Sequence, residues 1–396
     1  MNKLVQVEGE RQARMAWSCV VEPAETAAIA FVETMGAVDA WSWLDEQGGR
    51  LSDGRTSEVP KRLRKSVLRW HAAASHVTAS SLEGRLARCG EVRVVIPGDA
   101  DWPVILDDLQ GTRPLALWVR GNGNLAELFA RGASVVGARA ASAYGIAATT
   151  EIVCGLAARG HAIISGGAYG IDAAAHRAAL SVGGGTVAFM PGGVDVDYPA
   201  AHGALFRRIC EQGGLVMAEM GPSARPWKSR FLHRNRLIAA AGRAAVVIEA
   251  GIRSGAMSTA RQSALLSRPV GAVPGPITSR VSQGCHELMR TGVATCVYDA
   301  DHVVEMIASL TAQWDEGRAA TQGTLAIGAY RGRPRWLESA ARGVAACVES
   351  SAHGARVGDV IAATGLAANT VMTALGELEA AGLVAWDKGM WVSTRQ

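Results

Sequence analysis

Short apolar runs rich in β-formers alternate with helical segments between residues 133 and 309, and this alternation constrains the fold most strongly. We predict six strands, at ASVVG, AIIS, TVAFM, LVMAE, AVVIE and PVGAV. Segments between them, such as TTEIVCGLAARG and DAAAHRAAL, have the apolar spacing of helices. Because such alternation is typical of parallel sheets covered on both faces, the sequence predicts an α/β fold with a doubly wound parallel sheet.

All six predicted strands carry glycine just beyond their carboxyl ends, in GAR, SGGAYG, PGGVD, MGP, EAGIRSG and PGPI. One or two such glycines would be ordinary turn residues. Six at one edge of a sheet favour a binding cleft, because ligands of open α/β sheets bind outside the carboxyl ends of the strands. Glycine there also allows a ligand to approach the backbone closely.

The rest of the chain has a different character. Residues 1–90 predict a domain of short helices (SAM or helix-hairpin-helix-like), and residues 91–124 a turn-rich connector into the sheet domain, 91–310. The basic stretch KRLRKSVLRWHAAASHV in the first domain is either a solvated helix face or an auxiliary contact to a polyanion. A linker at 311–335 precedes a helix, a helix–turn–helix pattern and a hairpin at 336–396, which together predict a winged helix.

Composition excludes several classes of protein. At 396 residues the chain suits two or three domains, and no apolar run is long enough for a membrane span. The start, MNKLVQVEGERQARMAW, lacks an apolar signal core, and the seven scattered cysteines form no C-x-x-C pair. We therefore expect a cytoplasmic protein with neither a disulfide scaffold nor a zinc ribbon. A net charge of +4 does not by itself indicate nucleic acid.

The cleft lacks the fingerprints of the common nucleotide cofactors. No G-x-G-x-x-G follows the first strand and no G-x-x-x-x-G-K-[ST] occurs, so we predict neither NAD binding nor ATP hydrolysis, and no metal or cofactor. The best candidate for binding phosphate is the loop 165–172, in which consecutive backbone N–H groups can form an anion nest. Its Asp172 would repel phosphate, and we interpret it as the N-cap of the next helix. His176 is interpreted as a packed side chain.

Two further segments belong to the candidate site. The span 222–248 contains six basic residues and no acidic one, which suggests phosphate contacts, and Trp227 and Phe231 can stack on bases. The alternative is that Phe231 and Leu232 anchor the helix to the core, so that only some of the arginines contact a ligand. The segment 249–260 offers hydroxyl groups at Ser254 and Thr259 beside a glycine, although Ser254 taken by itself is better interpreted as a simple helix cap.

The motifs SGGAYGIDAAAH, FLHRNRLIAA, EAGIRSGAMSTA and VPGPI, in this order at these strand ends, resemble the DprA/Smf family of DNA-processing proteins. The upstream DADWPVILDDLQGTRPLALWVRGN and VVGAR are similar to the same family. The resemblance implies an extended Rossmann-like fold that binds single-stranded DNA, forms a homodimer and helps to load the RecA recombinase during natural transformation. It implies a binding protein and not an enzyme.

The predicted DNA-binding residues combine the motifs of that family with the basic span. Position 138 is Ala where a hydroxyl residue is common in the family, and position 233 is His where Pro or Lys is frequent, which puts one phosphate contact in doubt. The predicted set is Arg139, Ser165, Gly166, Gly167, Gly170, Lys228, Phe231, Arg234, Asn235, Arg236, Ser254 and Gly255.

Two other functions compete with this one. MPGGVDVDYP is faintly similar to the P-G-G-x-G-T-x-x-E loop of lysine-decarboxylase-like nucleotide phosphoribohydrolases, but it contains Asp195 and Asp197 and lacks the catalytic glutamate. A winged-helix transcription regulator is the other alternative. Its recognition helix would be AANTVMTALGELEA, with Glu377 and Glu379 and no basic residue, in a region of net charge −2. Such a helix is a poor reader of duplex DNA, so we predict that the winged helix is dispensable for single-strand binding.

Overall fold

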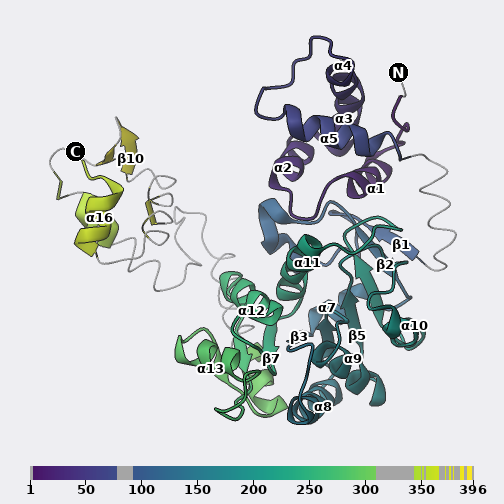
Figure 1. Ribbon diagram of the computed structural model, residues 1–396, viewed down its shortest axis with the longest axis vertical. Helices are drawn as coiled ribbons and strands as arrows, with labels where there is room; N and C mark the ends of the chain where they lie inside the picture. Colours follow the sequence, from purple (N-terminus) through teal and green to yellow (C-terminus); the bar gives the residue numbers. More distant parts are fainter. Residues whose placement is uncertain are drawn as a thin grey trace, which may run out of the picture. The chain divides into compact units, whose positions relative to one another are not determined.

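The computed structural model describes residues 3–77, 92–308 and parts of 343–394. The chain forms two compact units, Met1–Asp315 and Glu316–Gln396. The first unit consists of a small group of helices followed by a large sheet with helices on both faces (Figure 1). The second is much smaller and contains a two-stranded hairpin.

The sheet of the first unit has nine strands in the order β1-β2-β6-β5-β4-β3-β7-β8-β9. All neighbours from β6 to β9 are parallel, whereas β2 pairs antiparallel with both β1 and β6. The strands are β1 (Val92–Val95), β2 (Leu117–Arg120), β3 (Gly132–Val136), β4 (Ala162–Ser165), β5 (Thr186–Phe189), β6 (Leu215–Ala218), β7 (Ala244–Val247), β8 (Val270–Ala272) and β9 (Thr295–Cys296). The six strands predicted from sequence, β3 to β8, are therefore confirmed.

The segment 91–124, which the sequence predicts to be a connector, was wrongly assigned. It contributes the two antiparallel strands β1 and β2, with Trp118 opposite Val94 on one side and opposite Ala218 on the other. Both strands lie among turn signals and outside the strand–helix alternation of residues 133–309, so no sequence pattern marks them as strands. The extension of the parallel sheet by these strands confirms the extended Rossmann-like fold.

Successive residues of the parallel strands face two different cores. In β4, Ile163 belongs to one apolar cluster and Ile164 to another, and Val246 and Val247 of β7 divide in the same way. Helices α8 and α9 cover the first face, and α7, α11, α12 and α13 pack into the second core (Figure 1). This is the doubly wound arrangement. The helices are α7 (Leu125–Ala130), α8 (Ala143–Ala158), α9 (Ile171–Ser181), α10 (Gly203–Glu211), α11 (Lys228–Ala241), α12 (Gly255–Leu265) and α13 (Gln283–Arg290).

The helical region before the sheet is built around Trp17, which is completely buried. The rings of Trp41 and Trp70 contact it edge to face, with centroids 5.5 and 6.0 Å away. Gly36, at a positive φ of 82°, separates the helices Thr26–Met35 and Ala37–Trp43. The helices are α1 (Glu10–Val20), α2 (Thr26–Met35), α3 (Ala37–Trp43), α4 (Gly49–Ser52) and α5 (Arg64–Ala74). The described part of this region is thus helical, as predicted.

Polar contacts join these helices to the region of the sheet. The Trp118 indole N–H of β2 donates to Ser18 Oγ of α1 at 3.0 Å, and Trp118 and Trp17 belong to the same apolar cluster. Arg11 at the start of α1 forms a two-pronged ion pair with Asp99, at 2.6 and 2.8 Å. The helical region therefore packs directly on the antiparallel side of the sheet.

In the second unit the described strands β10 (Val384–Asp387) and β11 (Met390–Ser393) form the predicted antiparallel hairpin. Helix α16 (Val357–Thr364) lies in the predicted helix–turn–helix segment, and Val360 packs into a small core with Val384 and Trp391. The linker 311–335 and most of the recognition helix, 367–380, lie outside the described residues. The winged-helix assignment stays a prediction.

Candidate nucleic-acid interface

A cleft of about 670 Å³ opens at the carboxyl edge of the parallel sheet. Its sides come from Val136 and Gly137 after β3, Ala168 after β4, the first turns of α11, and the start of α12 after β7. Strands β3 and β7 are neighbours, but the chain continues from β3 towards β4 and from β7 towards β8, in opposite directions across the sheet. The cleft therefore lies at the switch point where ligands of such sheets bind, as the glycine-rich strand ends predict.

Seven predicted residues line this cleft: Arg139, Lys228, Phe231, Arg234, Asn235, Ser254 and Gly255. Gly166 borders a small adjoining pocket of about 30 Å³, together with Arg139, Phe231 and Arg234. That pocket also brings in Tyr169 and Tyr198, which the predicted site did not include. Tyr169 lies inside the SGGAYG motif, and Tyr198 follows the glycine-rich end of β5. An aromatic residue near a glycine-rich strand end is therefore the sequence feature that could have identified both as site residues.

Arg139 and Lys228 are the exposed cations of the cleft. Neither has a hydrogen bond or ion pair to another residue in the described part of the chain. The Arg139 guanidinium lies over the Phe231 ring, 5.3 Å from its centroid, a geometry that holds the charge in place without neutralising it. These two side chains remain available to an anionic ligand.

Arg234 is buried at the bottom of the cleft, with 6% of its surface exposed. Its Nη1 donates to the Phe189 carbonyl at the end of β5, at 3.0 Å, whereas its Nε has no partner among the described residues. Burial lowers the pKa of Arg234 to about 10, partly offset by the negative charge of Asp172, and the nearby Arg139 lowers it further. The side chain is thus still cationic at neutral pH.

Gly166 is needed for the position of Arg234. A Cβ at Gly166 would lie 1.6 Å from Arg234 Nη1, so any side chain there would displace the guanidinium. Gly170 has a φ of 78°, and a Cβ on it would lie 2.2 Å from the Ala138 carbonyl oxygen. This glycine therefore allows the loop before α9 to pack against the loop that carries Arg139.

Asp172 occupies the anion nest that the sequence assigned to phosphate. Its Oδ2 accepts hydrogen bonds from the backbone N–H groups of Gly166, at 3.2 Å, and Ala168, at 3.4 Å. The N-cap of α9 is Gly170, so the prediction that Asp172 is the N-cap was wrong; the carboxylate turns back from the first helical turn to the loop. Burial raises the pKa of Asp172, and Arg234 opposes this rise.

Asn235 joins helix α11 to helix α12 across the cleft, and Ser254 lies at the start of α12. The Asn235 amide donates to the Gly255 carbonyl at 3.3 Å. The Ser254 hydroxyl, at the N-cap position of α12, is buried and has no hydrogen-bond partner in the described ranges. A hydroxyl in this state beside the cleft can donate to a ligand oxygen.

Arg236 and Ser165 lie away from the cleft. The Arg236 guanidinium pairs with the Glu219 carboxylate through two hydrogen bonds, at 2.9 and 2.7 Å, and donates to the Thr112 carbonyl. Arg230, also from the span without acidic residues, pairs in the same manner with Glu22 of the helical region. Two cations of a span that is free of acids in sequence are thus neutralised by carboxylates from elsewhere in the fold. The Ser165 hydroxyl is buried and donates to the Val135 carbonyl at 2.6 Å.

The acidic residues of the loop after β5 hold other parts of the protein. Asp195 accepts from the Ser223 backbone N–H at 2.6 Å, and Asp197 pairs with Arg120 at 2.8 Å. His176 is buried beneath the loop, with its Nδ1 2.8 Å from Thr186 Oγ1. Within the ranges that the structure describes, His, Cys, Asp and Glu side chains form no cluster suited to a metal ion.

Rossmann topology with a cationic cleft at the switch point defines the class of protein, and comparisons with known proteins define the family. A family model for DNA recombination-mediator protein A matches residues 93–308. A putative DNA processing protein DprA of Mycobacterium tuberculosis is 42% identical over 324 residues, 79% of this chain and 79% of that protein. The chain therefore belongs to the family of DNA recombination-mediator protein A, which confirms the predicted DprA/Smf resemblance.

Other relatives agree. The DNA processing protein DprA of Streptococcus pneumoniae is 40% identical over 192 residues, 48% of this chain and 67% of that protein. The X-ray structure of DprA from Streptococcus pneumoniae matches with a TM-score of 0.54 and 28% identity, over 72% of this chain and 98% of that one.

No helix in the described ranges is both long and apolar enough to span a membrane.

Proposed function

We propose that this protein binds single-stranded DNA in the cleft at the switch point, protects incoming DNA and helps to load a RecA recombinase during DNA uptake. The observation that carries the proposal is the pair of exposed cations without carboxylate partners, Arg139 and Lys228, in a cleft that also contains the Phe231 ring. Cations beside an aromatic ring suit the phosphates and unstacked bases of a single strand. Membership of a recombination-mediator family supports the same function.

Most of the proposed contact residues line the cleft or its adjoining pocket, and Gly167 and Gly170 belong to the loop beside them. The buried Arg234 supplies a fixed positive charge below the ligand, and Ser254 and the first N–H groups of α12 can donate to a phosphate. We include Gly166 and Gly170 for the shape of the loop, whereas Arg236 and Ser165 have structural partners. The set is Arg139, Gly166, Gly167, Gly170, Lys228, Phe231, Arg234, Asn235, Ser254 and Gly255.

The test is a titration of labelled oligo-dT and of a duplex of equal length over a series of salt concentrations. We expect preference for the single strand, with affinity that falls steeply as salt rises, because phosphate binding releases counterions. Arg139→Ala and Lys228→Ala should each lower the binding free energy by about 1.5–3 kcal/mol, the worth of a charge-assisted hydrogen bond. Arg177→Ala, on the exposed face of α9, is the matched control. Equal or tighter duplex binding would contradict the proposal.

The recombinase and dimer functions are proposed from the family resemblance, together with a cytoplasmic location. We expect oligo-dT covered by single-strand-binding protein to start RecA-dependent ATP hydrolysis sooner when this protein is added, and the Arg139→Ala variant to lose that effect. Light scattering should give the mass of two chains. An unchanged lag or a monomer at all concentrations would contradict the respective function.

We further propose that the cleft binds without catalysis. Asp195 and Asp197 of the loop that is faintly similar to phosphoribohydrolases are engaged with Ser223 and Arg120, which leaves neither in the position of a catalytic glutamate at the cleft. Release of free base from nucleoside monophosphates above the rate in buffer would show the opposite.

A further inference from the structure

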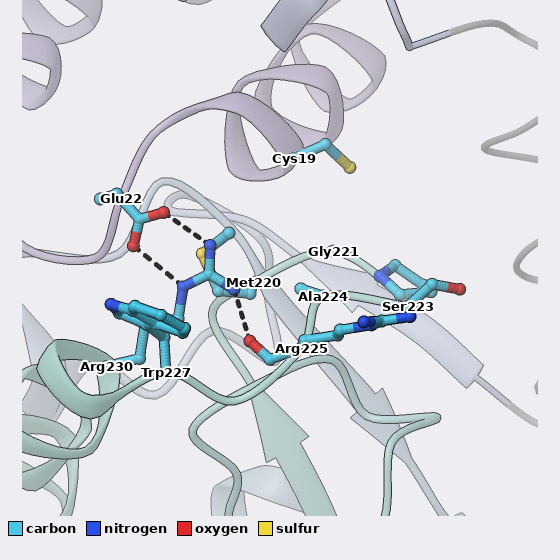
Figure 2. A pocket seen from close by; sticks show the side chains of 10 residues that line it. Cys19, Glu22, Met220, Gly221, Ser223, Ala224, Arg225, Trp227 and Arg230 are labelled. Carbon is cyan, nitrogen blue, oxygen red and sulfur yellow. Dashed lines mark hydrogen bonds and ion pairs between the residues drawn. The ribbon is translucent and has the colours of Figure 1, made fainter.

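A second cavity, of about 530 Å³, lies where the helical region meets the sheet, and we call it the junction cavity (Figure 2). It is bounded by Cys19 and Glu22 at the end of α1 and by the segment 220–230 that leads from β6 into α11. Its volume is within the range of about 300–1,000 Å³ typical of sites for small ligands. Neither the cleft nor its adjoining pocket shares a lining residue with it.

The junction cavity contains one cation that is not neutralised. The Arg230 guanidinium pairs with both oxygens of Glu22, at 2.9 and 2.6 Å, and also donates to the Arg225 carbonyl, as Figure 2 shows. The Arg225 side chain is exposed and pairs with no carboxylate among the described residues. The electrostatic character of the cavity is therefore that of Arg225, and it favours an anion.

An exposed aromatic side chain forms another side of the cavity. Trp227 has 71% of its surface exposed, although indole is among the side chains that proteins usually bury. It occupies the N-cap position of α11, and Met220 adds apolar surface to the same cavity. A cavity lined by both a tryptophan and an unpaired arginine has the chemistry to bind a nucleobase and a phosphate.

The segment that bears these side chains is held in place by the fold. The Ser223 backbone N–H donates to Asp195 Oδ1 at 2.6 Å, and the Gly193 N–H donates to the Ala224 carbonyl at 2.9 Å. The cavity is thus formed before a ligand arrives, which reduces the entropy lost on binding.

The junction cavity adjoins the cleft through the start of α11. Trp227 lines the junction cavity, and the next residue, Lys228, lines the cleft. Since consecutive Cα atoms are about 3.8 Å apart, a strand that contacts Lys228 needs to advance by only about one nucleotide to reach Trp227. We propose that the junction cavity binds a further nucleotide of the same single strand, with its base stacked on Trp227 and its phosphate on Arg225. This inference rests on the proposed function.

The test is a length series of oligo-dT, from four to twenty nucleotides, with the full chain. The affinity of the parent should rise with length until both sites are filled. Trp227→Ala and Arg225→Ala should each lose about tenfold in affinity for the long oligonucleotides and keep the parent's affinity for the shortest that binds. Trp227→Phe should retain most of the affinity because it preserves stacking. Matched controls are the exposed Tyr298→Ala and Arg207→Ala, which lie outside both cavities.

Alkylation of Cys19, followed by peptide mass spectrometry, gives a second readout. The thiol lines the junction cavity, so a twenty-nucleotide oligo-dT should slow its alkylation and the shortest binding oligonucleotide should not (Figure 2). The inference would be overturned if the Trp227 and Arg225 variants had the parent's affinity at every oligonucleotide length, or if long oligonucleotides left the rate of Cys19 alkylation unchanged. In that case Arg139→Ala would still weaken binding, and the proposed function would stand. A parent protein that binds no oligo-dT would instead overturn the proposed function.

Discussion

At the scale of single residues, His176 links stability to pH. The His176 side chain is completely buried. Because the Thr186 hydroxyl donates its proton to the Ile163 carbonyl, the hydroxyl oxygen of Thr186 accepts a hydrogen bond from His176 Nδ1. Burial lowers the pKa of His176 from 6.5 to about 3, with smaller contributions from His202, Arg234 and Arg177. Below pH 6.5 the unfolded chain binds a proton here that the folded protein does not, so acid favours unfolding.

We therefore expect the free energy of unfolding to fall between pH 6.5 and about 3, by up to about 1.4 kcal/mol per pH unit from this residue. Urea unfolding at a series of pH values measures it. His176→Asn removes the titration and should flatten that part of the profile, whereas the exposed His76→Asn should leave the slope as it was. The same slope in His176→Asn would assign the pH dependence to other groups.

The Arg236–Glu219 ion pair contributes to the stability of the fold and not to DNA binding. Both side chains are nearly buried, at 7% and 11% exposure. Arg236→Met leaves the Glu219 carboxylate without its partner and should lower the free energy of unfolding by about 3–5 kcal/mol. The double variant with Glu219→Met should regain most of it. Arg290→Met, which breaks an exposed pair with Glu287, is the control and should change little. A large loss of oligo-dT affinity in a folded Arg236→Met protein would return Arg236 to the binding site.

At the scale of elements, the turn between β4 and α9 positions the cleft. A strained backbone conformation costs about 1–3 kcal/mol. Gly170→Val should lower the free energy of unfolding by more than this, because the valine Cβ would also collide with the Ala138 carbonyl. Oligo-dT binding should be lost as the neighbouring loop moves with Arg139. Gly183→Val is a matched control, since Gly183 has a φ of 70° and open space around it. Thermal melts and titrations measure both effects, and full affinity in Gly170→Val would show that the turn does not position the site.

Elements with a strong periodic pattern could be predicted from sequence, and those defined by distant pairing could not. Strands β3 to β8 are continuous apolar runs, and their glycine-rich ends correctly indicated the cleft. Strands β1 and β2 lie among turn signals outside the strand–helix alternation, and they are recognised only by their antiparallel pairing with each other and with β6. In the same way Arg236 looked available because its partner Glu219 precedes the acid-free span, in the turn after β6. The place of Asp172 in the nest depends on a backward turn of its side chain that no spacing reveals.

At the scale of the whole molecule, we expect the first unit to bind DNA and the second unit to be dispensable for that binding. Residues Met1–Asp315 form one compact unit that contains both cavities, whereas residues 336–396 carry a net charge of −2. Because a negatively charged module is repelled by DNA, truncation after Ala308 should keep or slightly improve the affinity for oligo-dT. The comparison of truncated and full-length protein in the same titration measures this.

The contrary outcome is specific. If the second unit binds DNA through its hairpin, truncation costs tenfold or more in affinity, about 1.4 kcal/mol. Light scattering of the truncated protein, together with circular dichroism, serves as the control that the first unit is intact.

The order of strands in the sheet has a consequence for how the protein is made. Strand β3 pairs with β4 on one side and with β7 on the other. Ala244, the β7 partner of Ala133, is synthesised more than a hundred residues after it. Until then β3 is an unpaired apolar edge, the kind of surface on which chains associate. We expect nascent chains that stop before β7 to aggregate or to recruit chaperones, and chains that extend past α13 to be released folded. The cleft is complete only when α12 is added, so we expect a chain that ends before α12 not to bind oligo-dT.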